Sequence, residues 1–393
     1  MAPRRCAFII LAIASAAVAQ PAPQTFRHPG VLISQAELDA IRKRVAAAGA
    51  DDPVFAGFVH TMTTRFGDDT FKPQPAARLK RGDAKPDDSL SRLRTSGLTA
   101  YTLALKWAAT GDASARDAAI RTVDAWAEVV VACEPDTPKS ADASWALLPW
   151  CAAGELLERG KFDGQGSGWP ADRASRLKSM VRVLSTASRP LFDPRLAPTS
   201  SQASAALGGM AAGVYLDDAN LYAEARNFLL KQMPKLLTKA GYGNEIYLDP
   251  WQGTAGLAAI VQAAEVGRQQ GDLSLFQAKY DGQDEPRVLV SLKWYADPLR
   301  GVAVDVPPMG GPRYQPRPWR FVAAANTART TGGWEIGLNF YKYIEHRPGL
   351  DEYEDAVKKT YRPSEQQTTT SVQSDSLTHG ELYKPGSIVP LAK

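Results

Sequence analysis

The stretch of residues 93–131, LRTSGLTAYTLALKWAATGDASARDAAIRTVDAWAEVVV, decides which fold this sequence predicts. Apolar side chains recur at three- and four-residue spacing over residues 93–109 and again over residues 118–131, which indicates two helices. Between them, Gly111 supplies the left-handed residue that ends a helix, and Asp112 is a typical cap for the next one. Because so short a link brings the second helix back beside the first, the stretch predicts an antiparallel helical hairpin.

The same link and the same periodicity recur along the chain. Gln269-Gln270-Gly271-Asp272 repeats the link, and Ser34 and Glu37 have the spacing of a capping box at a helix start. Further helical patterns cover residues 143–157, 171–184, 203–216, 220–230, 253–268, 288–295 and 334–344. Alternating strand patterns are nearly absent, so we expect an all-α protein, a closed or incomplete ring of antiparallel helical hairpins.

The N-terminus has the order of features found in a secretory signal peptide. Arg4 and Arg5 precede an apolar run over residues 6–17, and Ala17-Val18-Ala19 fits the small-residue cleavage rule. No later run reaches the roughly 20 apolar residues that a membrane helix needs. We therefore expect residues 1–19 to be removed, and residues 20–393 to form a single secreted or periplasmic domain with a polar C-terminal tail.

Composition narrows the partners and cofactors to be expected. The chain holds 46 Lys and Arg residues against 42 Asp and Glu residues, and two of the basic residues belong to the expected signal peptide. The near-neutral remainder has no electrostatic footprint for nucleic acid. The chain has only four His residues, and its Cys residues lack metal-ligand spacing, which argues against a zinc site. We expect neither a metal nor a cofactor. Cys133 and Cys151 are expected either to form a disulfide or to remain free buried thiols.

Six stretches resemble the alginate lyase family of polysaccharide lyases in their order and spacing. They are His28-Pro29-Gly30-Val31-Leu32, Ser167-Gly168-Trp169-Pro170, GGMAAGVYLDD at 208–218, GLAAIVQAAEVGRQQGD at 256–272, Trp334-Glu335-Ile336 with Asn339-Phe340-Tyr341, and Arg347-Pro348-Gly349-Leu350. The resemblance spans residues 28–350 and implies an α/α toroid, an incomplete barrel of helical hairpins with an open groove for an acidic polysaccharide. It also implies β-elimination on uronic acids.

The chain departs from the family at positions of its site. Ser200-Ser201-Gln202 stands where the family has Asn followed by His or Trp. Glu245 and Asp249 fit family positions, whereas Leu248 and Gln252 stand where the family has Arg and His. These departures imply a divergent member, with a different substrate, a rearranged site or no activity.

β-Elimination needs a group that neutralises the C6 carboxylate, a base for the C5 proton and an acid for the departing O4. We predict that Gln202 is the neutralising group, because its amide can donate to a carboxylate; the alternative is a cap for the helix that follows. Tyr314 is the predicted base and acid, with the charge of Arg313 favouring its ionised form, and Tyr247 is the alternative base. The alternative is that the charged and polar residues of the loop around Tyr314 are only solvated at the surface.

A second group of residues is predicted to bind the substrate. Its members are Glu245, Asp249, Trp251, Gln252 and Arg317. Trp251 would stack on a sugar ring, and Arg317 would bind a sugar carboxylate through its planar fork. The alternative is a structural helix entry with Trp251 in the core. Trp145 and Trp150 are expected in the core, and His379 is a remote alternative base.

Three functions compete on this evidence. The first is a lyase for alginate or a glucuronan, acting as a monomer on an acidic polysaccharide, without nucleic acid or membrane as partner. The second is an inverting glycoside hydrolase, which needs carboxylates about 6.5–9.5 Å apart and would require a distant partner such as Asp142. The third is a carbohydrate-binding protein that kept the groove and lost the base.

Overall fold

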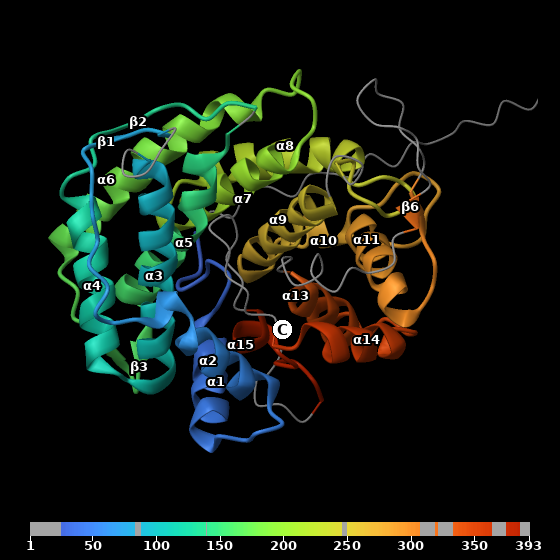
Figure 1. Ribbon diagram of the computed structural model, residues 1–393, viewed down its shortest axis with the longest axis horizontal. Helices are drawn as coiled ribbons and strands as arrows, with labels where there is room; N and C mark the ends of the chain where they lie inside the picture. The colour runs from blue at the N-terminus through green and yellow to red at the C-terminus, as the bar shows by residue number, and fades with distance from the viewer. Residues whose placement is uncertain are drawn as a thin grey trace, which may run out of the picture.

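The computed structural model describes residues 25–82, 88–138, 140–245, 250–306, 319–320, 333–363 and 375–385, so the expected signal peptide lies outside it. Helices dominate this part of the chain (Figure 1). They are α1 (Gln35–Ala47), α2 (Pro53–Thr63), η1 (Arg65–Gly67), α3 (Ser89–Thr110), α4 (Ala113–Ala127), α5 (Asp142–Arg159), α6 (Ala171–Ser188), η2 (Arg189–Phe192), α7 (Ser200–Tyr215), α8 (Ala219–Leu236), α9 (Pro250–Gln269), α10 (Ser274–Gln277), α11 (Arg287–Ala296), η3 (Asp297–Arg300), α13 (Trp334–Leu338), the π-helix η4 (Asn339–Ile344), α14 (Asp351–Tyr361) and α15 (Asp375–His379). Among the described residues no helix is both long and apolar enough to cross a bilayer.

Short strands accompany the helices. They are β1 (Arg78–Leu79), β2 (Ala132–Cys133), β3 (Lys161–Phe162), β4 (Gln165–Gly166), β5 (Asp305–Val306) and β6 (Trp319–Arg320). β1 pairs with β2 in parallel, whereas β3–β4 and β5–β6 are antiparallel. Each strand has two residues, so these pairs fasten loops and do not form a core.

The helices form two layers of a ring. In the inner layer α3 lies against α5, α5 against α7, α7 against α9, and α9 against α13 (Figure 1). α7 is buried at almost every position, because its Ala and Gly residues let neighbouring helices approach closely. The outer helices α4, α6 and α8 each bury one face against the inner layer. This arrangement confirms the predicted α/α toroid.

The inner helices α3, α5, α7 and α9 start at the same end of the ring. Arg94, in the second turn of α3, bonds to Asp142, the first residue of α5. Trp145 of α5 packs against the small apolar cluster that contains Ala205 of α7. Gly256 of α9 lies so close to the start of α7 that an added Cβ would stand 3.7 Å from Ser200. We call the end formed by the first turns of these four helices the N-terminal face.

The opposite end of the ring is covered by the segment that precedes α1. His28 bonds through Nδ1 to Glu155 of α5 at 2.8 Å and through Nε2 to Asp217, just after α7, at 2.9 Å. The backbone N–H of Gly30 also donates to Glu155, at 2.8 Å. Gln270, after α9, accepts from the N–H of Arg27 and donates to the carbonyl of Gly30. One short segment therefore joins the ends of three inner helices.

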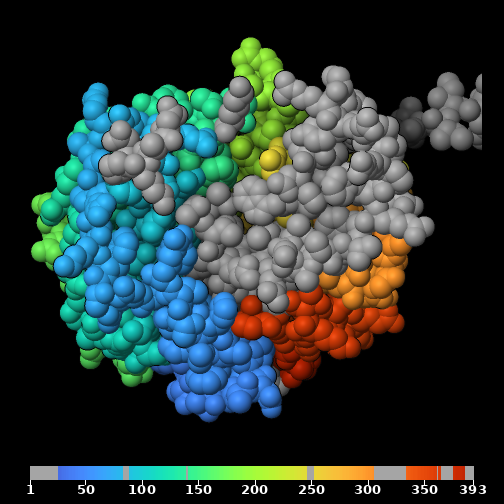
Figure 2. All heavy atoms as spheres, viewed as in Figure 1, coloured from blue at the N-terminus to red at the C-terminus, as the bar shows by residue number. Residues whose placement is uncertain are grey.

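The C-terminal segment closes the ring between α13 and α2, so that residues from both chain ends lie side by side (Figures 1 and 2). A buried ionic cluster holds it there. Arg268 of α9 bonds to Glu37 of α1 and to Glu265, both at 2.6 Å. His379 of α15 reaches Glu265 at 3.3 Å, and the Tyr383 hydroxyl lies 3.3 Å from Arg268. Opposite charges and hydrogen bonds offset the desolvation that burying these groups requires.

Most of the predicted local structure is confirmed. Ser34 and Glu37 form the capping box, Gly111 is left-handed with φ +75°, and Asp112 caps α4. Several boundaries differ. The helix predicted to reach residue 131 ends at Ala127, the helix predicted to end at residue 230 continues to Leu236, and the polar tail includes the buried helix α15.

Candidate functional site

The corner between the starts of α7 and α9 holds those predicted site residues that the structure describes. The carboxylate of Glu245 accepts the backbone N–H of Ser200 and so caps α7 from outside the helix. Burial raises the pKa of Glu245, although the hydrogen bonds from Ser200 lower it. The ionised carboxylate stands at the positive end of the α7 dipole, which favours its charge.

The segment before Glu245 is fastened to both helices. The side-chain amide of Asn244 donates to the carbonyl of Pro198 at 2.7 Å. Gly243 has no room for a Cβ, which would stand 2.6 Å from the carbonyl oxygen of Gly253 in α9. Gln252 lies half-buried beside this contact, in the first turn of α9. The close approach of Gly243 to Gly253 therefore places the segment that ends at Glu245 against the start of α9.

Gln202 lies behind this corner. Its side chain is 1% exposed, and its amide nitrogen donates to the carbonyls of Leu191 at 3.1 Å and Asp193 at 3.0 Å. Both amide hydrogens are thereby used, and the side-chain oxygen has no hydrogen-bond partner among the described residues. In this arrangement Gln202 has no donor left for a substrate carboxylate. Nor does it cap α7, because the amide bonds to the residues around η2.

The remaining predicted site residues cannot be placed. Tyr247, Asp249, Arg313, Tyr314 and Arg317 lie outside the described residues. Trp251 belongs to the first turn of α9, and its side chain is outside the description. Their predicted roles therefore stay predictions.

Sequence reasoning missed a second group on the N-terminal face, around the start of α5. Asp142 accepts hydrogen bonds from Arg94 and from the Ser140 hydroxyl, and Arg81 lies 3.6 Å from it. The Arg94 guanidinium stands over the Trp145 ring, 5.2 Å from its centroid. Trp145 was expected in the core and is instead half-buried, so one side of a large aromatic ring reaches the surface.

One sequence signal pointed to this group. Arg94 follows Leu93 at the start of a helical stretch rich in apolar residues, and a charge that is buried there requires a partner. The partner, Asp142, lies 48 residues away, so the sequence alone did not identify it. Nearby, Asp136 caps α5 by accepting the backbone N–H groups of Ala143 and Ser144, and burial raises the pKa of Asp136 to about 6.

Comparison with solved structures shows what this ring is similar to. The alginate lyase A1-III from Sphingomonas species A1 aligns with a TM-score of 0.61 at 14% identity, covering 93% of this chain and 99% of that one. A variant of that enzyme complexed with a tetrasaccharide aligns with a TM-score of 0.55 at 15% identity, covering 96% and 98%. An alginate lyase from Bacteroides ovatus aligns with a TM-score of 0.51 at 12% identity, covering 91% and 99%.

The chain has the alginate lyase fold. No family model matches the sequence, and no curated protein matches it either. The likeness is therefore one of fold, at low sequence identity, as expected for a divergent alginate lyase-like chain.

Three further expectations concern His379, Trp150 and the cysteine pair. His379 is 2% exposed and bonded to Glu265 in the ring closure, so it is not an accessible base. Trp150 lies in the core, edge to face with Trp126. Cys133 and Cys151 are both free thiols. Within the described ranges no group of His, Cys, Asp and Glu could hold a metal ion.

Proposed function

We propose that this protein is a secreted or periplasmic polysaccharide lyase that cleaves a uronic-acid polymer, of alginate or glucuronan type, by β-elimination. The observation that carries the proposal is the likeness to alginate lyases over nearly the full length of both chains. The site argues in the same direction. The N-terminal face gathers the starts of four inner helices, but Asp88, Asp136 and Glu245 already cap three of them, so the attraction for an acidic polymer comes from the arginines of this face.

The residues of the N-terminal face have the chemistry that this reaction needs. Arg81, whose side chain is 58% exposed, and the half-buried Trp145 flank the Arg94–Asp142 pair, so a carboxylate and a sugar ring could be bound on either side of it. With Gln202 turned away, a cation of this face would neutralise the C6 carboxylate and so acidify the C5 proton. Tyr314, or alternatively Tyr247, would take the C5 proton and return it to the departing O4.

The two competing functions have less support. An inverting hydrolase would need a distant carboxylate such as Asp142 as a partner, yet Asp142 is buried and bound by Arg94. The binding-protein alternative gains one observation, because the predicted neutralising group Gln202 is occupied by backbone carbonyls.

Product analysis distinguishes the three. Purified mature protein is incubated with alginates, glucuronan and neutral glucans, and both ultraviolet absorbance and reducing ends are followed. We expect absorbance to rise on one uronate polymer, because elimination leaves an unsaturated uronide, and Tyr314→Phe to abolish the rise. New reducing ends at constant absorbance would establish hydrolysis, and binding without either signal would establish a binding protein.

A further inference from the structure

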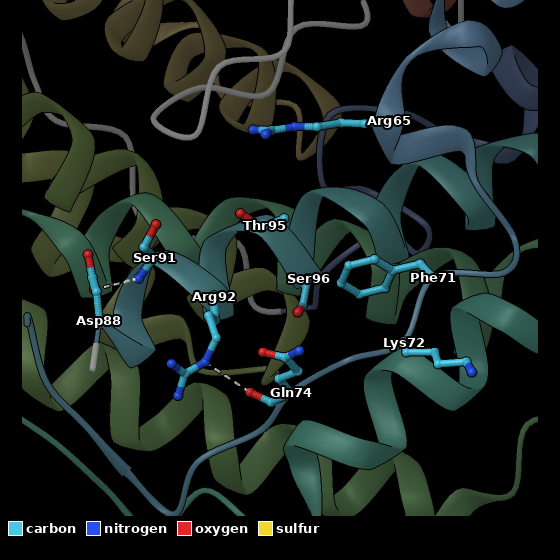
Figure 3. A pocket seen from close by; sticks show the side chains of 9 residues that line it. All are labelled: Arg65, Phe71, Lys72, Gln74, Asp88, Ser91, Arg92, Thr95 and Ser96. Atoms are coloured by element: carbon cyan, nitrogen blue, oxygen red, sulfur yellow. Dashed lines mark hydrogen bonds between the residues drawn. The ribbon is translucent and has the colours of Figure 1, made fainter. Parts of the chain in front are cut away.

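A basic cavity adjoins the N-terminal face at the start of α3. It has a volume of about 380 Å³, is open to solvent, and is lined by residues of the first two turns of α3 and of the segment 65–74, which precedes β1 (Figure 3). Arg65 reaches across the space from η1 toward Ser91 and Thr95 of α3, while Arg92 and Gln74 border it from the other side (Figure 3). The volume falls within the range of about 300–1,000 Å³ that is typical of small-ligand sites.

Positive charge dominates the lining. Among the described residues of the lining, Arg65, Lys72 and Arg92 are cations and Asp88 is the one carboxylate. The Asp88 carboxylate caps α3 by accepting the N–H of Ser91 at 2.9 Å, so part of its hydrogen-bonding capacity is used within the helix. Among the described residues no carboxylate forms an ion pair with Arg65 or Lys72.

The acidic residues nearest in sequence are bonded to other groups. Asp68 accepts both the backbone N–H and the hydroxyl of Thr70, at 2.9 and 2.7 Å. Asp69 accepts the Ser114 hydroxyl at 2.9 Å, on α4. In the described part of the lining, Arg65 and Lys72 are therefore cations that neither Asp68 nor Asp69 pairs with.

The other lining groups suit a sugar. Ser91 and Thr95 offer hydroxyl groups on one face of α3, and Gln74 offers an amide. Phe71 is half-buried and presents an apolar ring, on which the C–H face of a sugar can lie. The planar guanidinium groups of Arg65 and Arg92 match the two oxygens of a carboxylate, a geometry that Lys cannot reproduce.

The cavity leads from the N-terminal face to another side of α3, because Ser91 and Arg92 of its lining lie in the first turn of this helix. Arg92 and Arg94 are two residues apart on α3 and so project from different sides of the helix. Arg94 turns to Asp142 and Trp145 on the ring side, whereas Arg92 donates to the carbonyl of Gln74 on the outer side, at 3.3 Å. A polymer lying across the N-terminal face can therefore continue over α3 into the cavity.

We propose that this basic cavity is an anchoring site for a carboxylated sugar unit of the polymer, separate from the point of cleavage. The inference rests on the proposed function, because it takes the polymer to be built of uronic acids. An anchoring site holds a long chain in place without taking part in the reaction, so it should act on affinity for long substrates and not on turnover.

Calorimetric titration of an Arg65→Gln/Arg92→Gln variant tests the site. The probes are hexamannuronate, hexaglucuronate and neutral cellohexaose, and all proteins carry Tyr247→Phe and Tyr314→Phe so that the probe is not consumed. The matched control is Arg182→Gln/Lys231→Gln, which removes two exposed cations of the outer helices α6 and α8. Circular dichroism checks that each variant is folded.

We expect the cavity variant to bind at least one hexauronate about tenfold more weakly or worse, and the control to stay within about twofold of its parent. Equal losses of affinity in the cavity variant and the control would mean unspecific charge attraction and would overturn the anchoring site. Unchanged affinity in the cavity variant would overturn it as well. Tighter binding of a sulfated hexasaccharide than of either uronate would overturn the carboxylate assignment.

Activity measurements separate this inference from the proposed function. If the wild-type protein produces no unsaturated product but the cavity variant still loses uronate binding, the lyase proposal fails and the anchoring site stands. If polymer cleavage is normal and the cavity variant binds and cleaves like the wild type, the lyase proposal stands and the anchoring site fails.

Discussion

The two amide hydrogens of Gln202 are bonded to backbone carbonyls near η2, so its role in this structure is to hold that turn against α7. Replacement by Met keeps the length and removes both donors. We expect Gln202→Met to lower the free energy of unfolding by about 1–3 kcal/mol, because the buried carbonyl of Leu191 and the part-buried carbonyl of Asp193 lose their partner. Urea denaturation followed by circular dichroism measures the change.

Kinetics of the same variant distinguish structure from chemistry. If Gln202 is structural, the folded fraction of Gln202→Met should retain its turnover on the polymer that the wild-type protein cleaves. A loss of turnover of a hundredfold or more without any loss of stability would show instead that the amide turns toward the substrate carboxylate.

At the scale of an element, the segment before α1 is held by charge. Burial by itself lowers the pKa of His28, but the hydrogen bonds and charges of Glu155 and Asp217 outweigh it, so the pKa is raised above its ordinary value of 6.5. A histidine whose pKa is raised by folding contributes stability that is complete below the unfolded pKa and is lost as the pH rises through the folded one. The docking of this segment should therefore weaken in alkali.

The variant His28→Gln tests that dependence. We expect it to be less stable than the wild type by about 1–2 kcal/mol near pH 6, and the difference to shrink toward about pH 9. Thermal and urea unfolding across this range measure it, with His60→Gln as a control at an exposed histidine of α2. A difference that stays constant with pH would rule out the charged form of His28 as the source.

At the scale of the whole molecule, α15 closes the ring between α13 and α2. Leu377 of α15 is 1% exposed and lies in the hydrophobic core. We expect Leu377→Ala to destabilise the protein by about 2–5 kcal/mol, through lost burial and a residual cavity. Val302→Ala, at a side chain that is 44% exposed, should change stability by less than about 0.5 kcal/mol.

Urea unfolding of both variants decides whether the C-terminal segment belongs to the cooperative unit. If Leu377→Ala matched Val302→Ala, α15 would be a loosely attached addition to a ring that is stable without it. A large loss for Leu377→Ala alone would make ring closure part of the fold, as the buried pairing of His379 with Glu265 suggests.

The sequence by itself determined the helices and their links, because these depend on residues a few positions apart. The capping box of Ser34 and Glu37, and the left-handed Gly111 before the capping Asp112, are local devices whose geometry follows from residue type. Helical periodicity predicted the helices for the same reason, and the resemblance predicted that the helices form a toroid. Local signals failed only near boundaries, as at residue 131 and in the polar tail, where α15 is held by distant partners.

Only the tertiary structure decided how the site is arranged. Glu245 caps α7 from 45 residues away, and Arg94 finds Asp142 at a separation of 48. Gln202 is turned from its predicted task by carbonyls 9 and 11 residues before it, near a turn that the sequence did not predict. The basic cavity joins residues of η1, the segment before β1 and α3. Such contacts depend on which helices the ring places side by side, because a polar side chain takes whichever partner the packed helices bring within hydrogen-bond distance.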